Sequence, residues 1–127
     1  MPDRPNPTER ELAILKVLWE RQEATVREVY EDLRRDLPIV QNTVQAFLRT
    51  MEQKGLADHR TVGRSFVYRA AIRREDTERR MLSGVLDQLF DGSLDQLVAS
   101  ALAVRRPTQV ELRRLQELLR SAPEEPS

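Results

Sequence analysis

Apolar residues recur at helical spacing in two short segments near the start of the chain. Each segment opens with a Thr-x-x-Glu signature, at Thr8 and at Thr25, in which the threonine hydroxyl can accept a hydrogen bond from the amide three residues later. The pattern predicts that the first helix ends near Arg21 and that Pro38 stops the second. The sequence therefore predicts two short amphipathic helices, joined by about three residues, 22–24.

A third helical pattern runs from about Val40 to Lys54, and Gly55 follows it as the expected C-terminal glycine. At about 100° per residue, the side opposite its apolar stripe is polar, with one arginine and no acid. That side carries Asn42, Gln45, Ala46, Arg49 and Gln53.

The period changes from Leu56 to Ala71, where residues alternate in the manner of β-strands around Gly63 and Arg64. This pattern predicts a two-stranded hairpin with a basic tip. Three helices followed by a hairpin is the order of a winged helix-turn-helix, so the expected fold class is mainly α. In that fold the third helix is the recognition helix, which contacts the base edges of DNA, and the hairpin is the wing.

Helical patterns return in the last third of the chain, from Asp76 to Leu89, after Ser93, and after a third Thr-x-x-Glu signature at Thr108. Their apolar stripes need partners, and pairing with a second copy of the chain buries more than folding back. We expect a winged domain at 1–72, a helical dimerisation domain at 73–120 and a disordered tail at 121–127. The expected dimerisation residues are Leu82, Val85, Leu86, Leu89, Leu94, Leu97, Val98, Leu112, Leu115 and Leu119.

Composition narrows the chemistry of this 127-residue chain. It has no cysteine and a single histidine, His59, which excludes thiolate metal sites, cysteine nucleophiles and a His-rich metal site within one chain. We interpret His59 as a surface or phosphate-proximal side chain. Only four glycines are present and no phosphate-binding loop is among them. We therefore expect no enzymatic activity, no metal and no cofactor.

Charge is balanced over the chain, with 21 basic and 21 acidic residues, but it is not evenly distributed. Residues 37–74 carry seven basic and two acidic side chains, which favours one face that meets a polyanion. Asparagine and glutamine can pair with adenine, arginine with guanine, and a methyl group can contact thymine. We therefore predict a DNA-binding surface made of Asn42, Thr43, Gln45, Ala46, Arg49, Thr50, Arg60 and Arg64, with Arg69 as an alternative to Arg60.

Four segments carry a resemblance to a known family: PTERELAILKVLWE, NTVQAFLRTMEQKGLADHR, GRSFVYRA and LFDGSLDQLVASALA. Residues 7–104 resemble the penicillinase-repressor family, the BlaI/MecI type of winged-helix transcriptional repressor. The resemblance implies a homodimer whose winged domains bind a palindromic operator in double-stranded DNA and whose C-terminal helices dimerise. It also places Thr43 and its neighbours on the recognition helix and Arg64 on the wing.

Two departures from the family pattern bear on regulation. In the antibiotic-resistance repressors an Asn-Phe bond is cut during induction, and Ser100 and Ala101 stand at the corresponding place here. The sequence therefore gives no support for a sensor-protease partner. The copper-responsive branch of the family carries paired cysteines, which this chain lacks.

An alternative is a protein-interaction adaptor that has the winged fold without DNA binding. The acid-free face of the third helix argues against it, because an adaptor has no need to exclude acids there.

The sequence has no run of 18 apolar residues, and its polar, Pro-rich start differs from a secretory signal. We therefore expect no membrane insertion and a cytoplasmic location.

Overall fold

The structure is a computed structural model that describes residues 6–126 of the chain. Contacts divide it into two compact units, the first ending at Leu82 and the second beginning at Ser83. The sequence-based boundary after residue 72 falls earlier, before the helix α4 (Arg74–Phe90) in which the structural boundary lies. No helix in the described part of the chain is long and apolar enough to cross a membrane.

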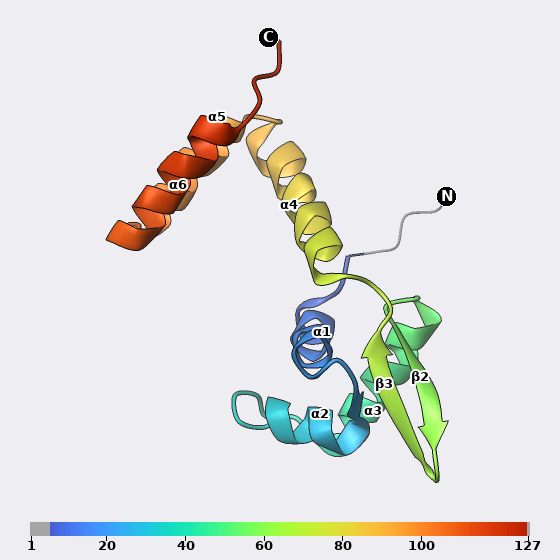
Figure 1. Cartoon of the computed structure of the whole chain (residues 1–127). Coiled ribbons are helices and arrows are strands. Elements are labelled where there is room, and N and C mark those ends of the chain that lie inside the picture. The colour runs from blue at the N-terminus through green and yellow to red at the C-terminus, as the bar shows by residue number, and fades with distance from the viewer. Residues whose placement is uncertain (1–5, 127) are drawn as a thin grey trace. The chain divides into compact units, whose positions relative to one another are not determined.

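Three helices and a small sheet build the first unit (Figure 1): α1 (Glu9–Arg21), α2 (Val26–Leu33) and α3 (Gln41–Gln53). Both predicted Thr-x-x-Glu signatures form complete capping boxes, at Thr8 with Glu11 and at Thr25 with Glu28. In each, the threonine hydroxyl accepts from the glutamate amide while the glutamate carboxylate accepts from the threonine amide. The caps explain why both helices begin where they do.

The sheet has three strands, and the predicted hairpin supplies two of them, β2 (Ala57–Val62) and β3 (Ser65–Ala70). Val62 pairs with Ser65, which leaves Gly63 and Arg64 as a two-residue turn. Gly63 has φ of 60°, a conformation that glycine adopts without strain. The predicted hairpin and its basic tip are therefore present.

The third strand was not predicted. β1 (Ala24–Thr25) lies in the segment expected to be a plain connection between the first two helices. It pairs antiparallel with β3, so the strand order is β1-β3-β2. This pairing attaches the base of the wing to the start of α2.

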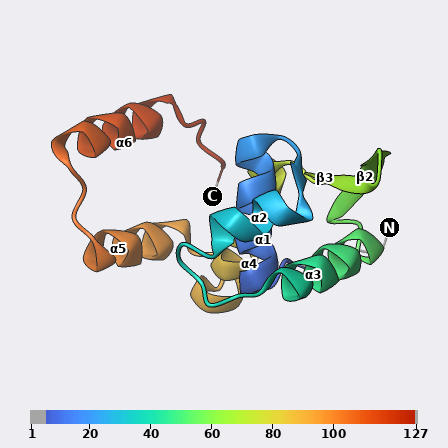
Figure 2. The same ribbon diagram turned by 90° about the horizontal axis from the view of Figure 1, so that it is seen from below.

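The core of the first unit is apolar and lies between α1, α2, α3 and the sheet. Its fully buried members include Ile14, Leu18, Val44, Leu48 and Met51. The apolar stripe of α3 is thereby turned inward, and its opposite side faces solvent. Figure 2 shows α3 along the edge of this unit, next to the strands of the wing.

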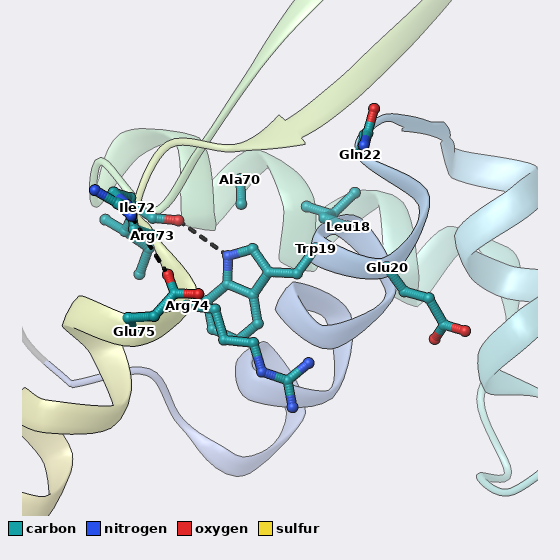
Figure 3. A pocket seen from close by; sticks show the side chains of 9 residues that line it. All are labelled: Leu18, Trp19, Glu20, Gln22, Ala70, Ile72, Arg73, Arg74 and Glu75. Carbon is teal, nitrogen blue, oxygen red and sulfur yellow. Dashed lines mark hydrogen bonds and ion pairs between the residues drawn. The ribbon is translucent and has the colours of Figure 1, made fainter.

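Two polar contacts fix the ends of this core. Lys54 donates from Nζ to the buried Glu11 carboxylate at 2.8 Å, which joins the end of α3 to α1. The indole Nε1 of Trp19 donates to the Ile72 carbonyl oxygen at 2.9 Å, and the Arg74 guanidinium lies over the indole ring. Figure 3 shows Trp19, Ile72 and Arg74 in the shallow pocket between α1 and the link from β3 to α4. Trp19 is thus partly buried and also holds the start of α4.

The second unit contains the end of α4, then α5 (Leu94–Val104) and α6 (Gln109–Ser121), as predicted from the helical patterns. Ser93 caps α5, and Thr108 forms the third capping box with Glu111. The two terminal nitrogens of the Arg105 guanidinium, Nη1 and Nη2, donate to the Glu111 carboxylate at 2.9 and 2.8 Å. Hydrogen bonds from Arg105 and from the Thr108 amide lower the pKa of Glu111 to about 2.

The second unit has no core of its own among the described residues. No residue of α5 or α6 is buried, and the last buried residue along the chain is Thr77. Residues 122–126 follow α6 without regular secondary structure, and Ser127 of the predicted tail lies outside the described residues.

Candidate nucleic-acid interface

The exposed side of α3 presents a continuous polar surface, which we call the α3 face and define as Asn42, Thr43, Gln45, Ala46, Arg49 and Thr50. All six residues are exposed. The side chains are amides, hydroxyls, a methyl group and one guanidinium, and none is acidic. These are groups that pair with base edges in a major groove.

The local sequence explains where α3 ends and how the chain turns from it into β2. Its C-terminus closes at Gly55, where φ is 80°. The Leu56 amide donates to Met51 and the Gly55 amide donates to Glu52, which together form a Schellman motif. The chain therefore leaves α3 sharply and enters β2, so that the wing lies next to the helix.

Arg49 and Arg64 are the cations of this surface that keep no ion-pair partner within residues 6–126. Arg49 lies on the α3 face and Arg64 on the turn of the wing, and both are exposed. Guanidinium groups without an internal partner can bind a base edge or a phosphate without breaking a contact first. These two residues are therefore the strongest of the predicted DNA ligands.

Arg60 lies on the wing, as predicted, but it is already engaged. Its guanidinium forks onto the Glu23 carboxylate at 2.7 and 3.2 Å, and this contact lowers the pKa of Glu23. Arg69, the alternative to Arg60, is also engaged, because its Nε donates a single hydrogen bond to Asp58 at 2.6 Å. Each pair is close to neutral, so these two arginines support the wing more than they add positive charge to it.

One contact between α3 and the wing was not predicted from the sequence. Glu52 Oε1 of α3 lies 2.6 Å from His59 Nδ1 of β2. The His59 ring stacks on Phe66, with centroids 4.1 Å apart, and lies near Tyr68. Burial raises the pKa of Tyr68, nearby Glu52 adds to the rise, and Arg49 opposes it. The hairpin register could have placed His59 on the side toward α3, but no pattern in the sequence indicates that Glu52 reaches it.

Comparison with known proteins identifies the family to which this chain belongs. The sequence pattern of the penicillinase repressor family matches residues 7–121, which is nearly the whole chain. The chain belongs to the penicillinase repressor family. It is accordingly a DNA-binding transcriptional repressor and not an enzyme, which decides against the adaptor interpretation.

Relatives in the penicillinase repressor family support the assignment over both units. The penicillinase repressor of Bacillus licheniformis is 26% identical over 115 residues, which cover 91% of this chain and 90% of that protein. The solution structure of the DNA-binding domain of the repressor BlaI matches with a TM-score of 0.52 and 30% identity. Monomeric Bacillus licheniformis BlaI in complex with the blaP half-operator matches with a TM-score of 0.51, also at 30% identity. Each of these two structures aligns with 60% of this chain and 93% of its own chain.

Proposed function

We propose that this repressor binds a palindromic operator as a homodimer, with one α3 face in each half-site. The observation that carries the proposal is the exposed α3 face, which has base-pairing side chains and no acid beside a basic wing tip. The solved relative bound to a half-operator supports the same placement. In this arrangement α3 enters the major groove and Arg64 contacts the phosphate backbone.

The second unit supports the homodimer. Its apolar side chains are exposed to an extent that a soluble protein rarely keeps, for example 71% for Leu89 and 72% for Leu119. Among the predicted dimerisation residues, Leu86 and Leu97 are half-buried and the other eight are exposed. We propose that a second copy of the chain covers this surface. Pairing then raises affinity, because the first half-site to bind holds the other winged domain close to the second.

The proposal includes no sensor protease. Ser100 and Ala101 lie inside helix α5, and a helical backbone must unwind before a protease can cut it. A repressor must reach the DNA that it controls, and a cytoplasmic location would allow this. That location stays a prediction from the sequence.

Selection of bound duplexes from a random pool tests the proposal. The full-length protein is incubated with duplexes that contain a random segment, and the bound fraction is amplified and sequenced over several rounds. We expect an inverted repeat with half-sites one helical turn, or a multiple of it, apart. Enrichment of a single unrepeated site would contradict the dimer, and no enrichment would contradict sequence-specific binding.

A further inference from the structure

The Glu52–His59 contact joins the recognition helix to the wing through a titratable group. A carboxylate can only accept a hydrogen bond, so the hydrogen at the 2.6 Å contact belongs to His59 Nδ1. This assignment fixes the neutral tautomer and leaves Nε2 as the atom that takes up a further proton. Nε2 has no hydrogen-bond partner among residues 6–126.

The surroundings of His59 allow that proton to arrive from solvent. The side chain is 25% exposed, with Phe66 and Tyr68 of β3 against its ring. The charged group that contacts it from α3 is Glu52, and Arg49 lies one turn earlier on that helix. The charged neighbours on β2 itself, Asp58 and Arg60, are paired with Arg69 and Glu23.

DNA changes the electrostatics at this place. Phosphates that approach the gap between α3 and the wing repel the Glu52 carboxylate and attract a positive charge. A nearby negative charge favours the protonated form of an imidazole. A proton on His59 Nε2 therefore offsets the charge of Glu52, and it makes the contact between helix and wing a full ion pair.

We propose that His59 is a positioning residue of the DNA interface that holds the wing to α3 through Glu52 and takes up a proton when DNA binds. This inference rests on the proposed function, because it requires phosphates between α3 and the wing. It gives the one histidine of the chain a role that neither a core position nor a metal site supplies.

The sign of the pH dependence follows from the direction of proton movement. Because the complex binds more protons than the free protein, affinity rises as the pH falls. Uptake of one whole proton would change the dissociation constant about tenfold per pH unit, and partial uptake changes it less. We expect the wild-type affinity to be roughly three- to tenfold higher at pH 6 than at pH 8, at constant ionic strength.

Fluorescence anisotropy with a labelled duplex measures this effect. The probe is the duplex enriched by selection from the random pool, titrated with full-length protein between pH 6 and pH 8. The informative variants are His59→Asn, whose amide can still donate to Glu52 but does not titrate, and His59→Leu, which has no donor. We expect both variants to lose the pH dependence. At pH 8 the asparagine variant should stay within about twofold of wild type, while the leucine variant binds more weakly.

Glu23→Gln is the matched control, because it removes a carboxylate that is ion-paired to the wing but has no contact with His59. It should keep the wild-type pH slope, whatever its affinity. Thermal unfolding followed by circular dichroism at each pH reports the folded fraction of every variant. Tight wild-type binding without a pH slope would overturn the role of His59 and leave the proposed function intact. Failure of the wild type to enrich any duplex would overturn both.

Discussion

Single side chains decide what the two faces of α3 do. Val44, Leu48 and Met51 are completely buried, whereas Arg49, between them in sequence, is exposed and free of ion pairs within the described residues. Helical periodicity alone separates these roles, so the division of α3 into a buried and an exposed face could be predicted from the sequence. The partners of the wing arginines could not, because they depend on which residues fold next to them.

Arg49→Ala and Arg64→Ala should weaken binding in different ways. Arg49→Ala removes a base contact, so it should cost about 1 to 3 kcal/mol on the selected duplex and relax preference at one base position. Arg64→Ala removes a phosphate contact, so it should weaken binding to all sequences and reduce the salt slope by about one. Gel-shift titrations on selected and random duplexes over a range of salt concentrations distinguish the two. Equal losses on both duplexes for Arg49→Ala would disprove its role as a reader.

Glu11 should stabilise the first unit in a pH-dependent manner. Burial alone would raise its pKa, but hydrogen bonds from Lys54 and the Thr8 amide outweigh burial, so the pKa lies below the ordinary value of 4.5. A lowered pKa means that the stabilisation is complete above about pH 4.5 and is lost as the pH falls through the folded-state pKa.

Glu11→Ala should lower the free energy of unfolding by about 2 kcal/mol at pH 7. This is less than for a fully buried ion pair, because water still reaches Lys54. The deficit should shrink at pH 3, which is below the ordinary pKa of 4.5, because the unfolded chain then binds a proton on Glu11 more readily than the folded protein does. Urea unfolding at both pH values measures it, with the exposed Glu9→Ala as control, expected within about 0.5 kcal/mol of wild type. A deficit that is the same at both pH values would mean that the ion pair is not its source.

Helix α4 is the element in which the first unit ends and the second begins. Gly84 lies in its interior, directly after Ser83, where the second unit begins. A Cβ atom placed on Gly84 meets nothing within 4 Å, so no close packing within the chain requires a glycine there. Glycine inside a helix lowers its stability, so we expect Gly84 to weaken α4 at this position.

Gly84→Ala should therefore stabilise α4 by about 1 kcal/mol. Thermal unfolding of the full-length protein measures the change, and Ser83→Ala on the neighbouring position serves as the control, expected to change stability by less than half as much. If Gly84→Ala destabilised the protein instead, another copy of the chain would have to approach closely at that position.

The elements that sequence patterns predicted well are those with local causes. The three capping boxes, Gly55 and the Gly63–Arg64 turn all depend on residues within a few positions of one another, and all were located correctly. β1 was missed because two residues show no period, and its pairing with β3 joins residues more than 40 positions apart. The same reason hid the Glu23–Arg60 fork, since β1 brings Glu23 to the wing. The contact of the predicted interface residues with DNA stays a prediction.

The two units differ in how they are stabilised. The first has a buried core, while the second exposes leucines and valines along every helix. Among the described residues, the helices of the second unit bury no side chain completely against one another. Helices this short gain most of their stability from packing of an apolar face, so the second unit requires a partner surface.

Leu89→Asp should break the proposed homodimer, because it places a charge in the centre of an apolar face. Gln88→Asp introduces the same charge on the adjacent, polar side and should leave the dimer intact. Light scattering coupled to size-exclusion chromatography gives the mass of each variant. We expect Leu89→Asp to be monomeric, to bind an isolated half-site normally and to bind the full inverted repeat at least tenfold more weakly than wild type. A monomeric wild type would contradict this arrangement.

The second unit has no buried core among the described residues, and this makes the amount of paired repressor depend on gene dosage. In the proposed homodimer a second molecule of the same kind covers this surface, so the covered fraction rises with the number of molecules that the cell holds. When most copies are single, halving their number leaves only about a quarter of the pairs. Small changes in synthesis or turnover would then alter target expression steeply, before any inducer acts.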